Sequence, residues 1–160
     1  MGALPAVSFF VLANVCVGDA GASALAAALE RGALPRLEYL ILQSAAIGDA
    51  GLLSLAPALR RRPALEGLYL YGNPFGDEGL AALVAPPPAD APPPQAEVLA
   101  RLEQLNLRGT QITDAGCDHL ASRLRSGALP ALSLLYLQEG SIPASDAAID
   151  AVHEARPGLY

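Results

Sequence analysis

The chain has 160 residues, of which 52% are hydrophobic and 16% are charged, so its composition is too apolar for a disordered protein. Its formal net charge is −6, and all ten of its basic residues are arginines. Because phosphate groups are bound by clustered cations, this balance argues against nucleic acid or an anionic membrane as the main partner.

Five segments of the chain share one pattern, in which five mainly apolar positions precede a short turn. The clearest copy is LEYLILQSAAIGDAG at residues 37–51, with apolar side chains at positions one, four, six, nine and eleven. Position eleven recurs after 30, 28, 37 and 30 residues, and it is occupied by Val17, Ile47, Phe75, Ile112 and Ile142. A recurring unit of this length is typical of a solenoid, in which each unit packs against its neighbours.

Each copy predicts a short parallel strand followed by a helix. The strands are expected near residues 7–13, 38–43, 66–71, 103–108 and 133–138. The helices are expected near residues 19–31, 49–62, 77–85, 114–126 and 144–155. Pro57 is expected to kink or shorten the second helix, because proline has no backbone N–H. Four aspartates stand where an N-cap carboxylate meets free backbone N–H groups, namely Asp19, Asp49, Asp77 and Asp114.

One spacing is longer than the others because it contains the proline-rich segment APPPADAPPPQ at residues 85–95. A run of this composition cannot be helical, and it is predicted to form an extended inserted loop between the third and fourth repeats. It lacks the PxxP spacing that proline-binding domains recognise, so we interpret it as a tolerated insertion.

Both ends of the chain match the interior of the repeat. Residues 2–7 contain the GALP sequence that joins a helix to the next strand at residues 32–37, and residues 156–160 match residues 62–66. We therefore expect residues 1–160 to form a single domain without a capping segment at either end. Such a domain is either a fragment of a longer protein or has its ends covered by a partner, including a second copy of itself.

Neither a targeting segment nor a disulfide framework is evident. The apolar run at residues 3–17 is shorter than the roughly 18 residues that cross a bilayer, and it lacks the basic segment of a signal peptide. Cys16 and Cys117 lie three repeats apart, too far for a disulfide, and we interpret both as buried thiols. The sequence therefore predicts a protein of the reducing cytoplasm.

The pattern L-x-x-L-x-L, followed by G-D-x-G and an alanine- and leucine-rich helix, resembles the leucine-rich repeat of the ribonuclease-inhibitor type. That type also occurs in NACHT-domain immune sensors and Ran GTPase-activating proteins. The resemblance covers nearly all of residues 4–160 and implies an α/β solenoid, a horseshoe segment with parallel strands on the concave face and helices on the convex face.

The chain departs from the family at position nine, which is usually Asn or Cys and bonds the backbone of the bend after the strand. Asn73 alone keeps this residue type. The other bends are expected to need water or another polar group, or to be looser, and their position-nine residues are Val15, Ala45, Thr110 and Gly140.

No sequence pattern indicates catalysis or metal binding. Cys117, Asp118 and His119 are consecutive on a predicted helix, so their side chains point about 100° apart and do not converge on one ion. His153 lies beside a row of carboxylates on the last predicted helix, which we interpret as a solvated face. The sequence therefore predicts a protein that is not an enzyme and that uses neither a cofactor nor a metal.

The predicted concave face is the surface that the sequence singles out. Because side chains alternate along a strand, positions four and six face the core, whereas positions three, five and seven face the concave side. This face is expected to hold four of the five tyrosines and a single charged residue, Arg108. The residues predicted to contact a partner are Phe9, Val11, Tyr39, Ile41, Tyr69, Tyr71, Asn106, Arg108, Tyr136 and Gln138.

Tyrosine offers a large contact area, few rotatable bonds and a polar tip, so an exposed tyrosine-rich sheet face favours a protein-binding module. The alternative is that these aromatic side chains brace neighbouring strands through cross-strand contacts. Two other functions stay open, namely a regulatory fragment resembling Ran GTPase-activating protein and a repeat fragment that assembles with itself through its uncapped ends.

Overall fold

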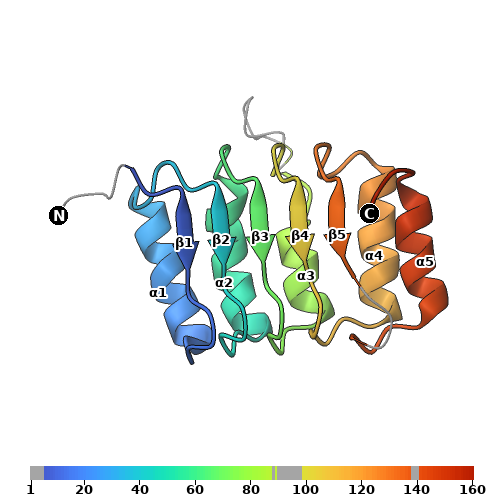
Figure 1. Ribbon diagram of the computed structural model, residues 1–160, viewed down its shortest axis with the longest axis horizontal. Helices are drawn as coiled ribbons and strands as arrows, with labels where there is room; N and C mark the ends of the chain where they lie inside the picture. Colours follow the sequence, from blue (N-terminus) through green and yellow to red (C-terminus); the bar gives the residue numbers. More distant parts are fainter. Residues whose placement is uncertain (1–5, 88, 90–98, 138–140) are drawn as a thin grey trace.

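The chain folds into strand–helix units that follow one another in space in the order of the sequence (Figure 1). The computed structural model describes residues 6–87, 89, 99–137 and 141–160. The strands are β1 (Phe9–Val11), β2 (Tyr39–Ile41), β3 (Gly67–Tyr69), β4 (Gln104–Asn106) and β5 (Leu134–Tyr136). The helices are α1 (Gly18–Glu30), α2 (Asp49–Arg60), α3 (Asp77–Leu83), α4 (Asp114–Arg125) and α5 (Asp146–Ala155). Most of the predicted proline-rich loop lies outside the described residues.

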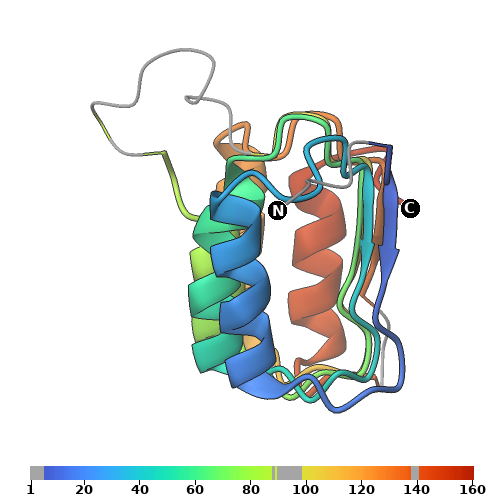
Figure 2. The ribbon, with the colours of Figure 1, turned by 90° about the vertical axis from the view of Figure 1, so that its left-hand side faces the viewer.

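The strands form one parallel sheet with the order β1-β2-β3-β4-β5. Figure 2 shows the strands in one layer and the helices in a second layer beside it. Equivalent positions of the repeat pair with one another, so that Phe9 lies opposite Tyr39 and Tyr39 lies opposite Gly67. The predicted α/β solenoid with parallel strands is confirmed, and its units are stacked in register.

Leucines fill the space between the two layers. At positions four and six of the second to fifth repeats, at most 5% of each side chain is exposed; these residues are Leu40, Leu42, Leu68, Leu70, Leu105, Leu107, Leu135 and Leu137. In the first repeat the same positions hold Phe10 and Leu12, which are half-buried because β1 is at the edge of the sheet. The predicted alternation is confirmed, so the intervening side chains point away from the helices.

Each strand is three residues long, shorter than predicted, because the backbone bends soon after it. Position eight of the first four repeats has a positive φ, with values of 57° at Asn14, 49° at Ser44, 71° at Gly72 and 65° at Gly109. This left-handed conformation turns the chain out of the strand direction and toward the next helix.

Asn73 holds two of these bends together, one of which belongs to the preceding repeat. Its amide oxygen accepts hydrogen bonds from the backbone N–H groups of Ala45 and Ile47, each at 3.1 Å. Its amide nitrogen donates to the carbonyl oxygens of Leu42 at 2.6 Å and Leu70 at 2.9 Å. The bend that has Ala45 at position nine therefore obtains its polar group from the next repeat.

The aspartates at the helix starts link neighbouring repeats, which corrects the predicted N-cap role. Asp49 lies inside the first turn of α2, and its carboxylate accepts hydrogen bonds from the backbone N–H groups of Gly76 and Gly79 at the start of α3. The carboxylate of Asp77 accepts in the same way from Thr113, and that of Asp114 accepts from Ser145. Each carboxylate thus satisfies free N–H groups of the following helix, where the helix dipole favours a negative charge.

Pro57 was expected to kink or shorten the second helix, and of these two effects the shortening is not observed. The helix α2 runs without a break through Pro57 and has 12 residues, the same number as α4. Pro57 and Leu53 both lie on the exposed side of α2, where the carbonyl that proline leaves unbonded can be hydrated. None of the described helices is long and apolar enough to cross a lipid bilayer.

The prediction that both cysteines are buried is half correct, because Cys117 is buried whereas Cys16 is exposed. Cys16 occupies position ten of the repeat, and the same position is exposed at Ala46, Pro74 and Gln111. This position lies at the outside of the bend, so the repeat itself explains the exposure of Cys16.

We expect iodoacetamide at pH 8 to label Cys16 in the native protein and to leave Cys117 unlabelled. Burial, followed by the nearby charge of Asp114, raises the pKa of the Cys117 thiol to about 11, so the reactive thiolate is scarce at pH 8. Mass spectrometry should show one added label on the native chain and two on the chain unfolded in urea. Equal labelling of both cysteines in the native chain would contradict this prediction.

Candidate functional site

The candidate site is the open sheet face, defined here as the side chains at positions three, five and seven that point away from the helices. The paired strands arrange positions three and five in two rows across the sheet. The first row is Phe9, Tyr39, Gly67, Gln104 and Leu134. The second row is Val11, Ile41, Tyr69, Asn106 and Tyr136. Sequence positions that lie up to 37 residues apart therefore become neighbours on one surface.

The predicted contact residues differ in how much of their surface remains exposed. The exposed fraction is 57% for Phe9, 53% for Val11 and 40% for Tyr71. The half-buried members of the set are Tyr39, Ile41, Tyr69, Asn106, Arg108 and Tyr136. The remaining predicted contact residue, Gln138, lies outside the described residues.

Aromatic rings cover the β1–β3 part of the open sheet face. The rings of Phe9 and Tyr39 are stacked, with their centroids 4.4 Å apart and their planes 9° from parallel. The ring of Tyr39 also extends over Gly67, where an added Cβ would lie only 2.4 Å from Tyr39 Cδ1. Gly67 is therefore needed for the position of the ring, a role that sequence reasoning missed although a glycine inside a strand signals a close approach.

The β4–β5 part of the face is polar. The hydroxyl of Tyr69 donates a hydrogen bond to Gln104 Oε1. Burial, and then the neighbouring Tyr136 and Tyr39, raise the pKa of Tyr69, so its phenol stays protonated at neutral pH and acts as a donor. The guanidinium of Arg108 lies 5.1 Å from the centre of the Tyr136 ring, a distance that allows a cation–π interaction.

Arg108 is the one charged side chain among the described members of the open sheet face. Its backbone N–H donates to Asn106 Oδ1 at 3.2 Å, and its Nε is buried without a hydrogen-bond partner among the described residues. A hollow of about 550 Å³ lies beside Arg108 and is bordered by Tyr136, His153 and Tyr160. The approach of His153 and Tyr160 to this cation was not predicted, because it depends on how the last helix and strand stack.

The half-buried tyrosines therefore brace neighbouring strands, as the alternative interpretation proposed. Tyr39 contacts Phe9, Tyr69 contacts Gln104, and Tyr136 lies under Arg108. Phe9, Val11 and Tyr71 nevertheless keep large exposed areas on the same face, although Phe9 also stacks on Tyr39. The half-buried rings therefore form a rigid base, and the exposed side chains lie on it or beside it.

The described residues contain no group of three or more His, Cys, Asp or Glu side chains that could hold a metal ion. Cys117 is buried in α4, whereas Asp118 and His119 are exposed, so the Cys117 side chain points away from the other two. His153 lies on a different helix, α5.

A family model described as Leucine Rich repeat matches residues 34–56, 65–84 and 101–121, which belong to the second, third and fourth repeats. Together with the parallel sheet and the alternating helices, these matches show that the fold is an α/β leucine-rich-repeat solenoid. No curated protein sequence matched the chain.

Among solved structures, the chain is similar in fold to a protein described as Leiomodin-1 Actin-Binding Site 2 (ABS2). The TM-score is 0.68 at 14% sequence identity, and the alignment covers 98% of this chain and 82% of the other. At this identity the likeness concerns the fold.

Proposed function

We propose that this chain is a non-catalytic, cytoplasmic recognition module of the ribonuclease-inhibitor type, which binds a protein partner on its open sheet face. The observation that carries the proposal is the exposure of Phe9, Val11 and Tyr71 on a face whose other aromatic rings are already braced. Exposed apolar side chains on a rigid base lose little conformational entropy when a partner covers them. Such side chains are typical of interface hot spots.

The chemistry of the face specifies the partner in part. The β1–β3 end suits an apolar segment, because it offers the stacked rings of Phe9 and Tyr39 next to Val11. The β4–β5 end suits a carboxylate, because Arg108 supplies a cation with no ion-pair partner among the described residues. A partner segment with apolar residues followed by an acidic residue would complement both ends in one orientation.

The size of the open sheet face sets the expected affinity. The face spans positions three to seven of each repeat, about 17 Å at roughly 3.3 Å per residue, and five repeats at about 4.8 Å spacing cover roughly 400 Å². A standard interface buries about 800 Å² on each partner. We therefore expect micromolar binding through this face alone, with tighter binding if the partner also contacts the surrounding bends.

We expect the double substitution Phe9→Ser and Tyr71→Ser to weaken partner binding by at least about tenfold, because two exposed hot-spot side chains are removed together. The partner is first captured from a cell lysate with the immobilised chain and identified by mass spectrometry. Its affinity for the wild-type and substituted chains is then measured by calorimetry. Actin is tested directly as well, because the solved structure of similar fold is described as an actin-binding site.

Leu53→Ser serves as the matched control, because Leu53 is 46% exposed but lies on the helix layer. Circular dichroism should show unchanged secondary structure for all of these variants. If the Leu53 variant loses as much affinity as the Phe9 and Tyr71 variant, the open sheet face is not the binding surface.

A further inference from the structure

The helix layer has a gap beside α3. This helix has seven residues, whereas its neighbours α2 and α4 have 12 each. It ends at Leu83 because Pro86 and Pro87 cannot continue a helix and disfavour helical backbone at the residue before them. The neighbouring helices extend past this end, so the last turns of α3 are missing from an otherwise continuous layer.

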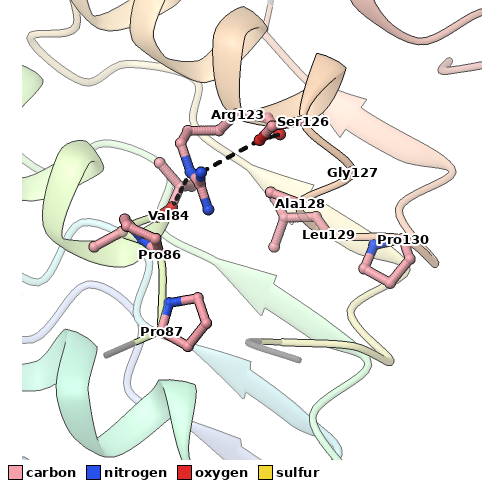
Figure 3. A pocket seen from close by; sticks show the side chains of 10 residues that line it. Val84, Pro86, Pro87, Arg123, Ser126, Gly127, Ala128, Leu129 and Pro130 are labelled. Carbon is pink, nitrogen blue, oxygen red and sulfur yellow. Dashed lines mark hydrogen bonds between the residues drawn. The ribbon is translucent and has the colours of Figure 1, made fainter. Parts of the chain in front are cut away.

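A hollow of about 380 Å³ occupies this gap. Figure 3 shows Pro86 and Pro87 on one side of it, Leu129 and Pro130 on the other, and Arg123 between the two sides. The Leu129 side belongs to the turn after α4, which is held from behind by the guanidinium of Arg156. The hollow thus combines apolar walls with one cationic side chain, a combination typical of small ligand sites.

Arg123 is held in place with part of its hydrogen-bonding capacity unused. Its Nε donates to the carbonyl oxygen of Val84 at 2.9 Å, and one terminal nitrogen donates to Ser126 Oγ at 3.2 Å. Ser126 is itself fixed by donating to the carbonyl oxygen of Arg123. A guanidinium has five N–H donors, so further donors remain for a ligand in the hollow.

A second arginine approaches the same segment from the opposite side. Arg60, the last residue of α2, donates to the carbonyl oxygen of Pro86 at 2.8 Å, and its buried Nε has no partner among the described residues. Burial, followed by the charges of Arg123 and Arg61, lowers the pKa of Arg60. Arg60 and Arg123 bring two positive charges to one short segment, because their guanidinium groups donate to carbonyl oxygens only two residues apart.

Neither Arg60 nor Arg123 forms an ion pair with a carboxylate of the described residues, since the ion pair found among those residues joins Arg101 and Glu66. Each guanidinium donates to a different carbonyl beyond the last residue of α3, Arg123 to Val84 and Arg60 to Pro86. These neutral acceptors do not balance the repulsion between two positive charges held on one short segment. An anion in the hollow would offset this repulsion.

We propose that the hollow between α3 and the turn after α4 binds the C-terminal residue of a peptide, with its carboxylate on Arg123 and its apolar side chain against Pro86, Pro87 and Leu129. Arginine suits this ligand because its planar guanidinium donates charge-assisted hydrogen bonds to carboxylate oxygens. Arg60 contributes positive potential from outside the hollow. The apolar walls favour a carboxylate joined to an aliphatic group over a free inorganic anion.

The test uses two probes that differ only in charge, N-acetyl-leucine and its uncharged amide, added to the full chain labelled with ¹⁵N. We expect N-acetyl-leucine to shift the amide signals of Val84, Ser126 and Leu129 saturably, with a dissociation constant on the order of millimolar for so small a ligand. The uncharged probe should bind at least tenfold more weakly. Equal shifts from both probes would overturn the proposal.

Substitutions then locate the site. Arg123→Gln should reduce affinity for N-acetyl-leucine about tenfold or more, and Arg60→Gln should reduce it less, because Arg60 acts through its charge alone. Arg125→Gln is the matched control, since it removes one exposed charge from the same helix away from the hollow. An equal loss in the Arg125 variant would show a general charge effect and would contradict the site.

Ala85→Leu tests the site without touching either arginine, should Arg123→Gln disturb the end of α3. The larger side chain should fill the hollow and abolish binding of N-acetyl-leucine. Asp90 and Glu97 are carboxylate residues of the segment 90–98, which lies outside the described residues. Replacing them together, as Asp90→Asn with Glu97→Gln, should leave the ligand-free signals of Val84, Ser126 and Leu129 unchanged. A shift of these signals would identify a carboxylate of this chain as the occupant and would overturn binding of a separate peptide.

Discussion

Replacing Asn73 with Ala should lower the free energy of unfolding by about 3–5 kcal/mol, because it leaves several buried backbone groups without partners. The side chain is fully buried and bonds the N–H groups of Ala45 and Ile47 and the carbonyl groups of Leu42 and Leu70. Each such group costs about 1–3 kcal/mol when it is buried and unpaired, and partial rearrangement keeps the total below the simple sum.

Urea denaturation followed by circular dichroism measures this change. Thr110→Ala is the matched control, because Thr110 occupies the same position of the next repeat and its hydroxyl donates one hydrogen bond, to the carbonyl of Leu107. We expect the control to cost about 1 kcal/mol. An equal cost for both variants would show that Asn73 does not join two repeats energetically.

Replacing Phe75 with Ala should cost about 3–5 kcal/mol, because it removes a large buried ring and leaves a cavity between stacked repeats. Phe75 is fully buried and is the largest such side chain among the described residues. Position eleven in the neighbouring repeats holds Ile47 and Ile112, which are also fully buried. Phe75→Ile should therefore cost less, about 1–2 kcal/mol, since the repeat accommodates a branched aliphatic side chain there.

Thermal and urea denaturation of the two Phe75 variants test this ranking. Hydrogen exchange adds a second readout, because a solenoid loses stability first in the units that adjoin the substituted one. We expect faster amide exchange in α2 and α3 than in α5. A uniform increase in the exchange rate across all helices would contradict the view that each repeat is stabilised mainly by its neighbours.

Much of the fold was predictable because the repeat occurs five times in the sequence. The recurrence of leucine at positions four and six identified the buried side of every strand, and Leu68 and Leu105 are buried as expected. The same alternation placed Tyr39, Tyr69 and Tyr136 on the side away from the helices. An ambiguous residue in one copy does not change the interpretation, because the other four copies show the same pattern. The strand–helix order and the parallel sheet could therefore be predicted from the pattern.

The properties of the candidate site were less predictable, because they arise between repeats. The alternation of side chains along the strands grouped the tyrosines on one face, but it did not separate the braced Tyr69 from the exposed Tyr71. Gly67 makes room for Tyr39 of the preceding repeat, and this contact exists only when β2 and β3 pair. Arg60 and Arg123 donate hydrogen bonds to the same short segment after α3, although they lie 63 positions apart in the sequence.

The sequence by itself determined the repeating unit, the side of each strand that is buried and the aromatic character of the opposite side. These depend on local periodicity, since the direction of a side chain follows from its position along a strand or helix. Only the tertiary structure decided that Asp49 serves the following helix, that Asn73 joins two bends and that a short α3 leaves a hollow beside Arg123. Those features depend on groups about 30 residues apart, which meet when successive repeats stack in register.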